Sequence, residues 1–140
     1  MNIYFAWSIK GNPQGTHLYP IIIEELKKHG KVLTEIFQWL HQMPNKKQYN
    51  SDREIFNQDI KLLKQSNVLV AEVTWPSHGC GREICYAQYV LKIPIICLYL
   101  EWTNISSMLK WNDYLQLYNY NEKNLLDIIQ NKLTNLNSKL

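Results

Sequence analysis

The chain has 140 residues, of which 46% are hydrophobic, and its formal net charge is +3 at pH 7. This length and apolar content suit a single domain, residues 1–140, with its own core. The lysines are scattered and only two arginines occur, which weighs against a nucleic-acid-binding protein. The N-terminal residues lack the regions of a signal peptide, and no apolar run is long enough to span a membrane. We therefore expect a soluble, cytoplasmic protein that binds neither nucleic acid nor membranes.

Short runs of β-branched and aromatic residues alternate along the chain with longer segments of helical period. This alternation is typical of a parallel sheet covered by helices. The predicted strands are residues 2–7, 31–35, 67–73, 93–100 and, from a weaker pattern, 114–120. The predicted helices cover residues 15–30 and 52–66, begin again near Gly81, and cover 105–111 and 121–133, where Asn121 is a plausible cap. We expect an α/β fold: a single-domain three-layer sandwich, Rossmann-like or flavodoxin-like, with a five-stranded parallel sheet.

Polar residues follow the predicted strands at the carboxyl ends, the edge where open α/β sheets bind their ligands. After the first strand, Ser8, Lys10 and Gly11 offer a hydroxyl, a cation and a flexible backbone beside a helix N-terminus. This combination suits a phosphate, although an ordinary glycine-containing loop explains it about equally well. The polar segment 41–51 is predicted to be a disordered loop or a lid over a site.

Two acidic residues, Asp59 and Glu83, are candidates for a chemical role. Asp59 sits at the edge of the apolar face of the second predicted helix, although a solvated surface aspartate is the default interpretation. Glu83 follows Ser77 and a Gly-x-Gly pair, Gly79 and Gly81, which predicts a turn where the backbone can approach a ligand. We place Glu83 in the first turn of the next helix, where the helix dipole favours its charged form. A carboxylate that only stabilises the helix would explain Glu83, but not the serine and glycines before it.

Histidine, cysteine and glutamate occur together between residues 78 and 85, but their spacing does not favour a metal site. Neither the zinc deaminase pattern nor the His-Glu-x-x-His pattern occurs. Cys80 and Cys85 fall on different faces of the predicted helix, and no motif presents a histidine as the base for a cysteine nucleophile. We expect no metal ion and no cofactor, and we interpret Cys80, Cys85 and Cys97 as small buried thiols of an intracellular protein.

Four segments resemble one enzyme family in their order and spacing. They are IYFAWSIKG at residues 3–11, VLTE at 32–35, the run 52–87, which contains AEVTWPSHGCGRE, and SSMLK at 106–110. Together they resemble the 2′-deoxynucleoside 5′-monophosphate N-hydrolases, a branch of the nucleoside 2-deoxyribosyltransferase superfamily. The resemblance implies an N-glycosidase that hydrolyses the N-glycosidic bond of a deoxynucleoside 5′-monophosphate to a free base and 2-deoxyribose 5-phosphate.

The resemblance also implies catalytic roles. Glu83 would be the nucleophile that attacks the anomeric carbon, forming a covalent sugar intermediate that water then resolves. Asp59 would position the nucleophile and assist proton transfer, and Tyr4 would lie in the same site. This division of labour between two carboxyl groups is the one that retaining glycosidases use.

The same resemblance places the 5′-phosphate against Ser8 and Ser77. Ser106 of a neighbouring subunit, with Met108 nearby, would complete the phosphate site of a homodimer. A serine at position 77 suits a phosphate, because the branch that handles free nucleosides usually carries an aspartate there, which would repel a dianion. The substrate-binding residues that the resemblance implies are Trp7, Ser8, Ile9, Lys10, Gly11, Ser77, Gly79, Gly81, Ser106 and Met108.

Three residues depart from the family pattern. Trp7 replaces a glycine and would narrow the pocket or stack on a base, so the preferred base stays open. Lys10 replaces an arginine, which keeps the charge but loses the bidentate fork. Arg82 replaces a residue that is often aromatic, and it points either to the phosphate or, as we favour, to solvent.

Two other functions stay open at this point. One is a transferase that moves deoxyribose between bases on nucleosides. The other is a non-catalytic nucleotide-binding module in which Trp7 blocks productive binding. Ribose and deoxyribose both remain candidates for the sugar, because the group that would crowd a 2′-hydroxyl depends on fine geometry.

Overall fold

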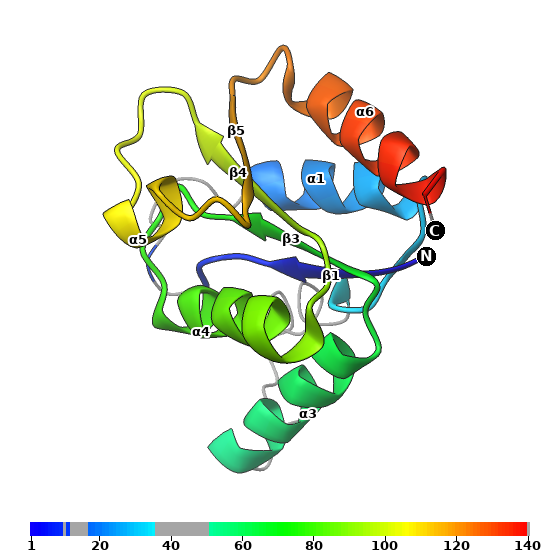
Figure 1. The fold of residues 1–140 in the computed structure, drawn as a ribbon, viewed down its shortest axis with the longest axis vertical. Coiled ribbons are helices and arrows are strands. Elements are labelled where there is room, and N and C mark those ends of the chain that lie inside the picture. Colours follow the sequence, from blue (N-terminus) through cyan, green and yellow to red (C-terminus); the bar gives the residue numbers. More distant parts are fainter. Residues whose placement is uncertain (10, 12–16, 36–50, 140) are drawn as a thin grey trace.

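A sheet of five parallel strands forms the centre of the molecule (Figure 1). The computed structural model describes residues 1–9, 11, 17–35 and 51–139. The strands in these residues are β1 (Asn2–Ala6), β2 (Lys31–Val32), β3 (Val68–Glu72), β4 (Ile95–Leu100) and β5 (Gln116–Tyr120). Their order across the sheet is β2-β1-β3-β4-β5, and every neighbouring pair is parallel. The predicted α/β fold is confirmed.

Helices cover both faces of the sheet and give the sandwich three layers. The helices in the described residues are α1 (Leu18–Lys27), α3 (Asp52–Lys64), α4 (His78–Tyr86), the π-helix η1 (Ala87–Leu91), α5 (Ser107–Lys110) and α6 (Leu125–Asn137). Helices α1 and α6 lie on one face, and α4 with the end of α3 lies on the other (Figure 1). None of these helices combines the length and apolar character needed to cross a membrane.

Alternation along the central strands supplies side chains to both faces. Ile3 and Phe5 of β1 pack into the core under α1 and α6, whereas Tyr4 and Ala6 pack into the core under α4. All of β3 is buried, as expected for a central parallel strand with helices on both sides. Successive residues of one strand therefore contribute to opposite sides of the protein.

Strand β2 is shorter than the predicted strand 31–35, because a side chain takes over its pairing with β1. The Leu33 amide still donates to the Ile3 carbonyl at 2.9 Å. Beyond it, the buried Thr34 hydroxyl accepts from the Phe5 amide at 3.0 Å and donates to the Phe5 carbonyl at 2.8 Å. Thr34 thus satisfies the backbone of β1 where a further strand residue would otherwise have done so.

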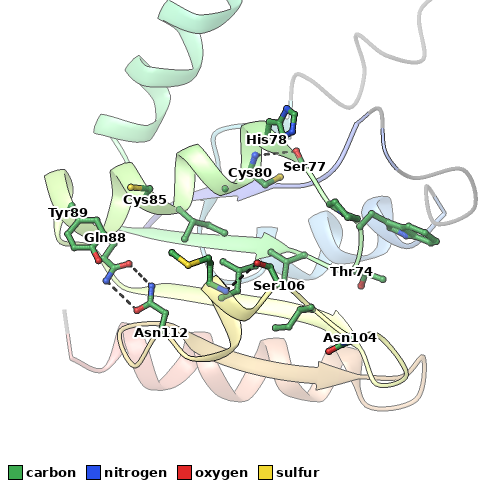
Figure 2. Close-up of a pocket in the computed structure, with 18 residues that line it drawn as sticks. Thr74, Ser77, His78, Cys80, Cys85, Gln88, Tyr89, Asn104, Ser106 and Asn112 are labelled. Atoms are coloured by element: carbon green, nitrogen blue, oxygen red, sulfur yellow. Dashed lines mark hydrogen bonds between the residues drawn. The ribbon is translucent and has the colours of Figure 1, made fainter.

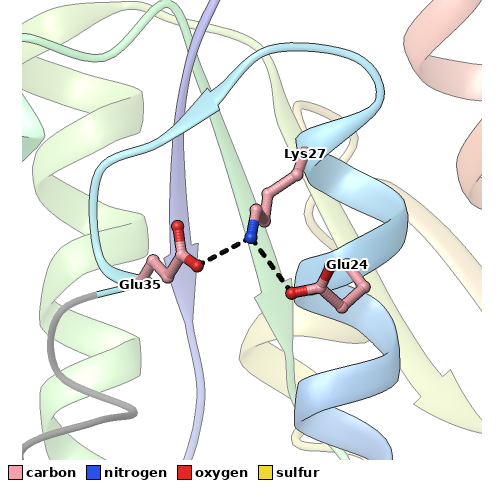
Figure 3. A network of polar contacts seen from close by, with 3 residues as sticks. All are labelled: Glu24, Lys27 and Glu35. Carbon is pink, nitrogen blue, oxygen red and sulfur yellow. Dashed lines mark hydrogen bonds and ion pairs between the residues drawn. The ribbon is translucent and has the colours of Figure 1, made fainter.

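A lysine fixes the chain after β2 against helix α1 (Figure 3). Lys27 Nζ lies 3.1 Å from Glu24 Oε1 and 2.8 Å from Glu35 Oε1. Hydrogen bonds to Glu35 and Glu24 raise the pKa of Lys27 above its ordinary value. Since this network is exposed to solvent, it orders the end of the segment rather than adding much stability.

Helix α4 begins at His78, earlier than the predicted start near Gly81. The Ser77 side chain caps it by accepting from the Cys80 amide at 3.2 Å, so Gly79 and Gly81 lie inside the helix. The predicted Gly-x-Gly turn is therefore wrong, and no described glycine has a positive φ. Glu83 is the sixth residue of α4, in its second turn, and not in the first turn as predicted.

The predicted helix 121–133 is displaced by four residues at each end, because α6 runs from Leu125 to Asn137. Its N-cap residue is Asn124, so the prediction that Asn121 is the cap is wrong. The Asn121 side chain lies in the preceding turn, where it accepts from the amides of Lys123 at 3.0 Å and Asn124 at 3.2 Å. Ser51 caps α3 by accepting from the Glu54 amide. The rest of the predicted loop, residues 41–50, lies outside the described residues.

The role of Thr34 can be tested by unfolding in urea. Thr34→Val keeps the shape of the side chain but leaves the amide and carbonyl of Phe5 without partners, so we expect a loss of about 2–4 kcal/mol in the free energy of unfolding. Thr34→Ser keeps the hydroxyl and should lose clearly less. Thr134→Val on the exposed side of α6 is the matched control, with an expected change within about 0.5 kcal/mol. Equal stability of the two valine variants would contradict this account of β2.

Candidate active site

The strand order shows where on the sheet a ligand is expected to bind. In the order 2-1-3-4-5, β1 and β3 are neighbours although the chain leaves β1 toward β2, so the connections diverge between them. Ligands of such sheets bind outside the carboxyl ends of the strands at this point. The segments that follow β1 and β3 carry most of the predicted site residues.

A hydrogen bond joins the first strand to helix α4. The buried Tyr4 hydroxyl donates to Glu83 Oε1 at 2.6 Å. Tyr4 faces the α4 side of the sheet, and Glu83 is partly buried on the face of α4 turned toward it. The structure thus brings together two of the three predicted catalytic residues.

Asp59 of helix α3 belongs to the same electrostatic cluster. Burial raises the pKa of Asp59 to about 6. Burial raises the pKa of Glu83 to about 7, where the Tyr4 hydrogen bond lowers the pKa and the charge of Asp59 raises it. Burial, followed by the charge of Glu83, raises the pKa of Tyr4 well above its ordinary value. The pKa of the Glu83 carboxyl group therefore lies close to neutral pH. Burial disfavours its charged form and outweighs the stabilisation by the helix dipole that the sequence predicts.

The loop after β1 is tied to the loop after β3. The buried Ser8 hydroxyl donates to the Pro76 carbonyl at 3.2 Å and accepts from the Gly11 amide at 3.1 Å. A Cβ on Gly11 would lie 2.7 Å from both the Pro76 oxygen and Ser8 Oγ, so this approach requires glycine. Ile9 between them is exposed, and Lys10 lies outside the described residues.

The N-terminus of α4 is open to solvent. Ser77 is partly buried, and Gly79 and Gly81 are exposed. Among the described residues, a Cβ on Gly81 would meet no atom within 4 Å, and one on Gly79 would meet only Ser77 Oγ at 3.8 Å. The packing of these residues therefore does not require either glycine.

A cavity of about 400 Å³ lies on a different side of α4 from Glu83 (Figure 2). Gly81, Ile84 and Cys85 line it and share one helix face by their spacing, whereas Glu83 does not line it. Across the cavity lie Ser106, which caps α5 through the Met108 amide, and Met108 itself, which is 83% exposed.

Within one chain, then, the predicted phosphate-binding residues Ser77 and Ser106 border the same cavity. Its far end is closed by Gln88 and Asn112, whose side-chain amides exchange two hydrogen bonds.

Trp7 and Arg82 both lie against aromatic rings. The Trp7 ring stacks on Phe5 with centroids 5.2 Å apart and lies 6.0 Å from Tyr19, which places it on the α1 side of the sheet and not beside Tyr4. Arg82 is exposed and lies over the Phe56 ring at 5.8 Å.

The cysteines differ in burial. Cys80 and Cys97 are buried as predicted. The prediction that Cys85 is buried is wrong, because this residue lies on the face of α4 that lines the open cavity. In the part of the chain that the structure describes, no cluster of three or more His, Cys, Asp or Glu side chains could hold a metal ion.

Sequence reasoning missed one polar group near this edge. Glu72, the last residue of β3, is only 1% exposed and accepts hydrogen bonds from Thr74 and Tyr120. The available signal was an acid inside an otherwise apolar strand, VLVAEV, where a solvated charge cannot be accommodated.

Comparisons with known proteins agree with this architecture. The sequence model of the nucleoside 2-deoxyribosyltransferase family matches residues 3–131. The 5-hydroxymethyl-dUMP N-hydrolase of Danio rerio is 33% identical over 135 residues, which cover 93% of this chain and 94% of that protein. The enzyme of the same name from Rattus norvegicus is 39% identical over 99 residues, 70% of this chain and 60% of that protein.

Among solved structures, the fold is similar to that of the Clostridium botulinum CMP N-glycosidase BcmB, with a TM-score of 0.60 and 17% sequence identity. The match covers 100% of both chains and supports the fold. The family match extends from β1 into the last helix and contains Tyr4, Asp59 and Glu83. The chain therefore belongs to the nucleoside 2-deoxyribosyltransferase family.

Proposed function

We propose that this protein hydrolyses the N-glycosidic bond of 2′-deoxynucleoside 5′-monophosphates, releasing the base and 2-deoxyribose 5-phosphate. The observation that carries the proposal is the cluster of Tyr4, Asp59 and Glu83, two carboxyl groups and a phenol enclosed at the edge of the sheet where ligands bind. The names of the Danio and Rattus relatives supply the substrate class.

Glu83 acts as the nucleophile in this proposal. The Tyr4 hydroxyl engages Oε1 and fixes the orientation of the carboxylate, so Oε2 is the oxygen that we assign to attack on the anomeric carbon. As the new C–O bond forms, the N-glycosidic bond breaks and its electron pair leaves with the base. The developing positive charge on the sugar is stabilised by the adjacent carboxylate, as in retaining glycosidases.

Asp59 handles the proton. With a pKa raised to about 6, its carboxyl group is partly protonated near neutral pH and can deliver a proton to the departing base. In the second half of the reaction, the resulting carboxylate takes a proton from the water that attacks the anomeric carbon. The C–O bond to Glu83 then breaks, which releases the sugar phosphate and restores both groups.

The 5′-phosphate lies at the N-terminal end of α4 in this proposal. Helix amides at such an end favour an anion, and Ser77 adds a hydroxyl beside it, whereas the buried Ser8 hydroxyl donates to the Pro76 carbonyl and positions the loop. The exposed Gly79 and Gly81 leave room for close approach of the substrate. Ile9 and Gly11 of the first loop complete this side of the site in the proposal.

A second copy of the chain contributes to the site in this proposal. Ser106, the N-cap of the short helix α5, and Met108 within that helix are exposed, as is Tyr89 on the lining of the cavity. Val90 and Trp111, which adjoin cavity-lining residues in the sequence, are exposed as well. A homodimer would cover these side chains and would bring Ser106 of one subunit to the phosphate of the other.

The proposed reaction can be tested with Glu83→Ala and Glu83→Gln. We expect each to reduce base release from deoxynucleoside monophosphates by at least about 10³-fold, because no other group replaces the nucleophile. Chromatography should follow free base from a panel of deoxynucleotides, ribonucleotides and 5-hydroxymethyl-dUMP. Asp113→Asn at an exposed position serves as the control, and circular dichroism checks that each variant is folded.

Three outcomes would contradict the hydrolase. The first is that the wild-type protein releases no base from any member of the panel. The second is that Glu83→Ala keeps its rate. The third is that base exchange between free nucleosides proceeds without net hydrolysis, which would identify a transferase.

The two neighbours of Glu83 should move its pKa in opposite directions. Asp59→Asn removes a nearby negative charge, so the pKa of Glu83 should fall below its value of about 7. Tyr4→Phe removes a donor that stabilises the carboxylate, so the pKa should rise. The ¹³C shift of the Glu83 carboxyl carbon, followed by NMR against pH, reports both changes. Because Glu83 must be ionised while Asp59 is protonated, the wild-type kcat/KM profile should be bell-shaped, with its acidic limb near pH 6 and its basic limb near pH 7. Shifts of the same sign in both variants would be inconsistent with this cluster.

Subunit mixing tests whether Ser106 acts in the neighbouring site. Ser106→Ala and Glu83→Ala homodimers should both be impaired, but a mixed dimer contains one site with Glu83 and Ser106 intact. Random exchange should therefore restore about a quarter of wild-type activity. If Ser106 acts within its own chain, or if ultracentrifugation finds only monomers, mixing will restore nothing.

A further inference from the structure

The buried carboxylate of Glu72 has no role in the proposed reaction. It ends β3 and points to the same side as Val68 and Val70, into the core under α1 and α6, opposite to Tyr4. Only 1% of the residue is exposed. A buried carboxylate is costly unless hydrogen bonds compensate for the lost solvation, so its partners indicate what it does.

Among the described residues, Glu72 accepts three hydrogen bonds, all of them at Oε1. The Thr74 hydroxyl donates to it, as do the Thr74 amide at 3.3 Å and the Tyr120 hydroxyl at 3.1 Å. The Thr74 oxygen in turn accepts from the Leu100 amide at 3.0 Å. Burial raises the pKa of Glu72, and the hydrogen bonds from Thr74 and then Tyr120 lower it. One carboxylate thus joins the carboxyl ends of β3, β4 and β5.

The backbone held in this way leads directly to the phosphate side of the site. Two residues after Thr74, the Pro76 carbonyl accepts from Ser8, and the next residue, Ser77, caps α4. A shift of Thr74 would displace both contacts, because residues 75 and 76 are the only link between them. The Tyr4–Glu83 bond lies on the opposite face of the sheet and does not depend on this segment in the same way.

We infer that Glu72 is a positioning residue that sets the 5′-phosphate subsite by holding Thr74, and with it the segment from Thr74 to Ser77. The inference rests on the proposed function for the identity of the ligand. It predicts a specific defect: variants of Glu72 lose recognition of the phosphate and retain the chemistry at the sugar. A purely structural role would reduce both together.

The direct test is calorimetric binding of 2-deoxyribose 5-phosphate and of 2-deoxyribose to the full-length protein. Wild-type protein should prefer the phosphorylated sugar, and Glu72→Gln, which weakens the acceptor, should lose about tenfold of that preference. Tyr120→Phe removes one donor and should lose less. Thr74→Val should match Glu72→Gln, whereas Thr74→Ser restores the hydroxyl and should restore the preference.

Leu26→Ala is the matched control, since it opens the same core at a fully buried residue of α1 that is neither paired with Glu72 in the sheet nor hydrogen-bonded to it. It should lower the melting temperature at least as much as Glu72→Gln but keep the preference for the phosphate. In turnover assays, Glu72→Gln should raise KM for a deoxynucleoside monophosphate by about tenfold with kcat little changed.

The possible failures are distinguishable. A loss of preference in Leu26→Ala equal to that in Glu72→Gln would overturn the inference by showing a general effect of destabilisation. An unchanged preference in Thr74→Val and Tyr120→Phe would also overturn it, and these milder variants decide the matter if Glu72→Gln does not fold. A wild-type protein that binds both sugars equally overturns it as well. If binding behaves as expected but no base is released, the proposed hydrolysis fails and the phosphate subsite stands.

Discussion

The parallel pairing of β1 with β3 is the constraint on which the candidate site depends. Residues far apart in the chain are paired along these strands, with Tyr4 opposite Leu69 and Ala6 opposite Ala71. The segments that leave the two strands must therefore run side by side, which is why Ser8 can bond to the Pro76 carbonyl. The same pairing brings α4 over β1 and allows Tyr4 to reach Glu83. A single register thus fixes both the Tyr4–Glu83 pair and the proposed phosphate loops.

Burial, more than the helix dipole, sets the protonation of the reactive carboxyls. Glu83 lies in the second turn of α4, beyond the amides that lack helical partners, and its burial outweighs the hydrogen bond from Tyr4. In the proposed mechanism, the raised pKa makes Glu83 a stronger nucleophile and a poorer leaving group, so a pKa of about 7 is a compromise between the two steps. Asp59, with a pKa raised to about 6, is the acid of that proposal.

The sequence predicts the sheet well because its strands are buried on both faces and appear as apolar runs bounded by polar turns. It predicts local ends less well, where a single side chain decides the outcome. Thr34 replaces backbone pairing and shortens β2, and the Ser77 cap draws two glycines into α4 that otherwise indicate a turn. The hydrogen bond between Glu72 and Tyr120 could not be predicted, because the two residues are 48 positions apart and no local pattern reveals such a contact. The predicted groups Tyr4, Asp59 and Glu83 are near one another, as the resemblance implied, but their roles remain predictions.

The sheet divides the proposed work between its two faces. Bond cleavage belongs to the face under α4, where Tyr4 and Glu83 meet, whereas the segment that would bind phosphate is held from the other face by Glu72. Ser77 stands where these two supports converge, at the start of α4 and at the border of the cavity. A nucleotide that reaches Glu83 with its sugar and Ser77 with its phosphate must therefore lie along the N-terminal end of this helix. The cavity across α4 is then left for other groups, and the exposed side chains around it are those that a second subunit would cover.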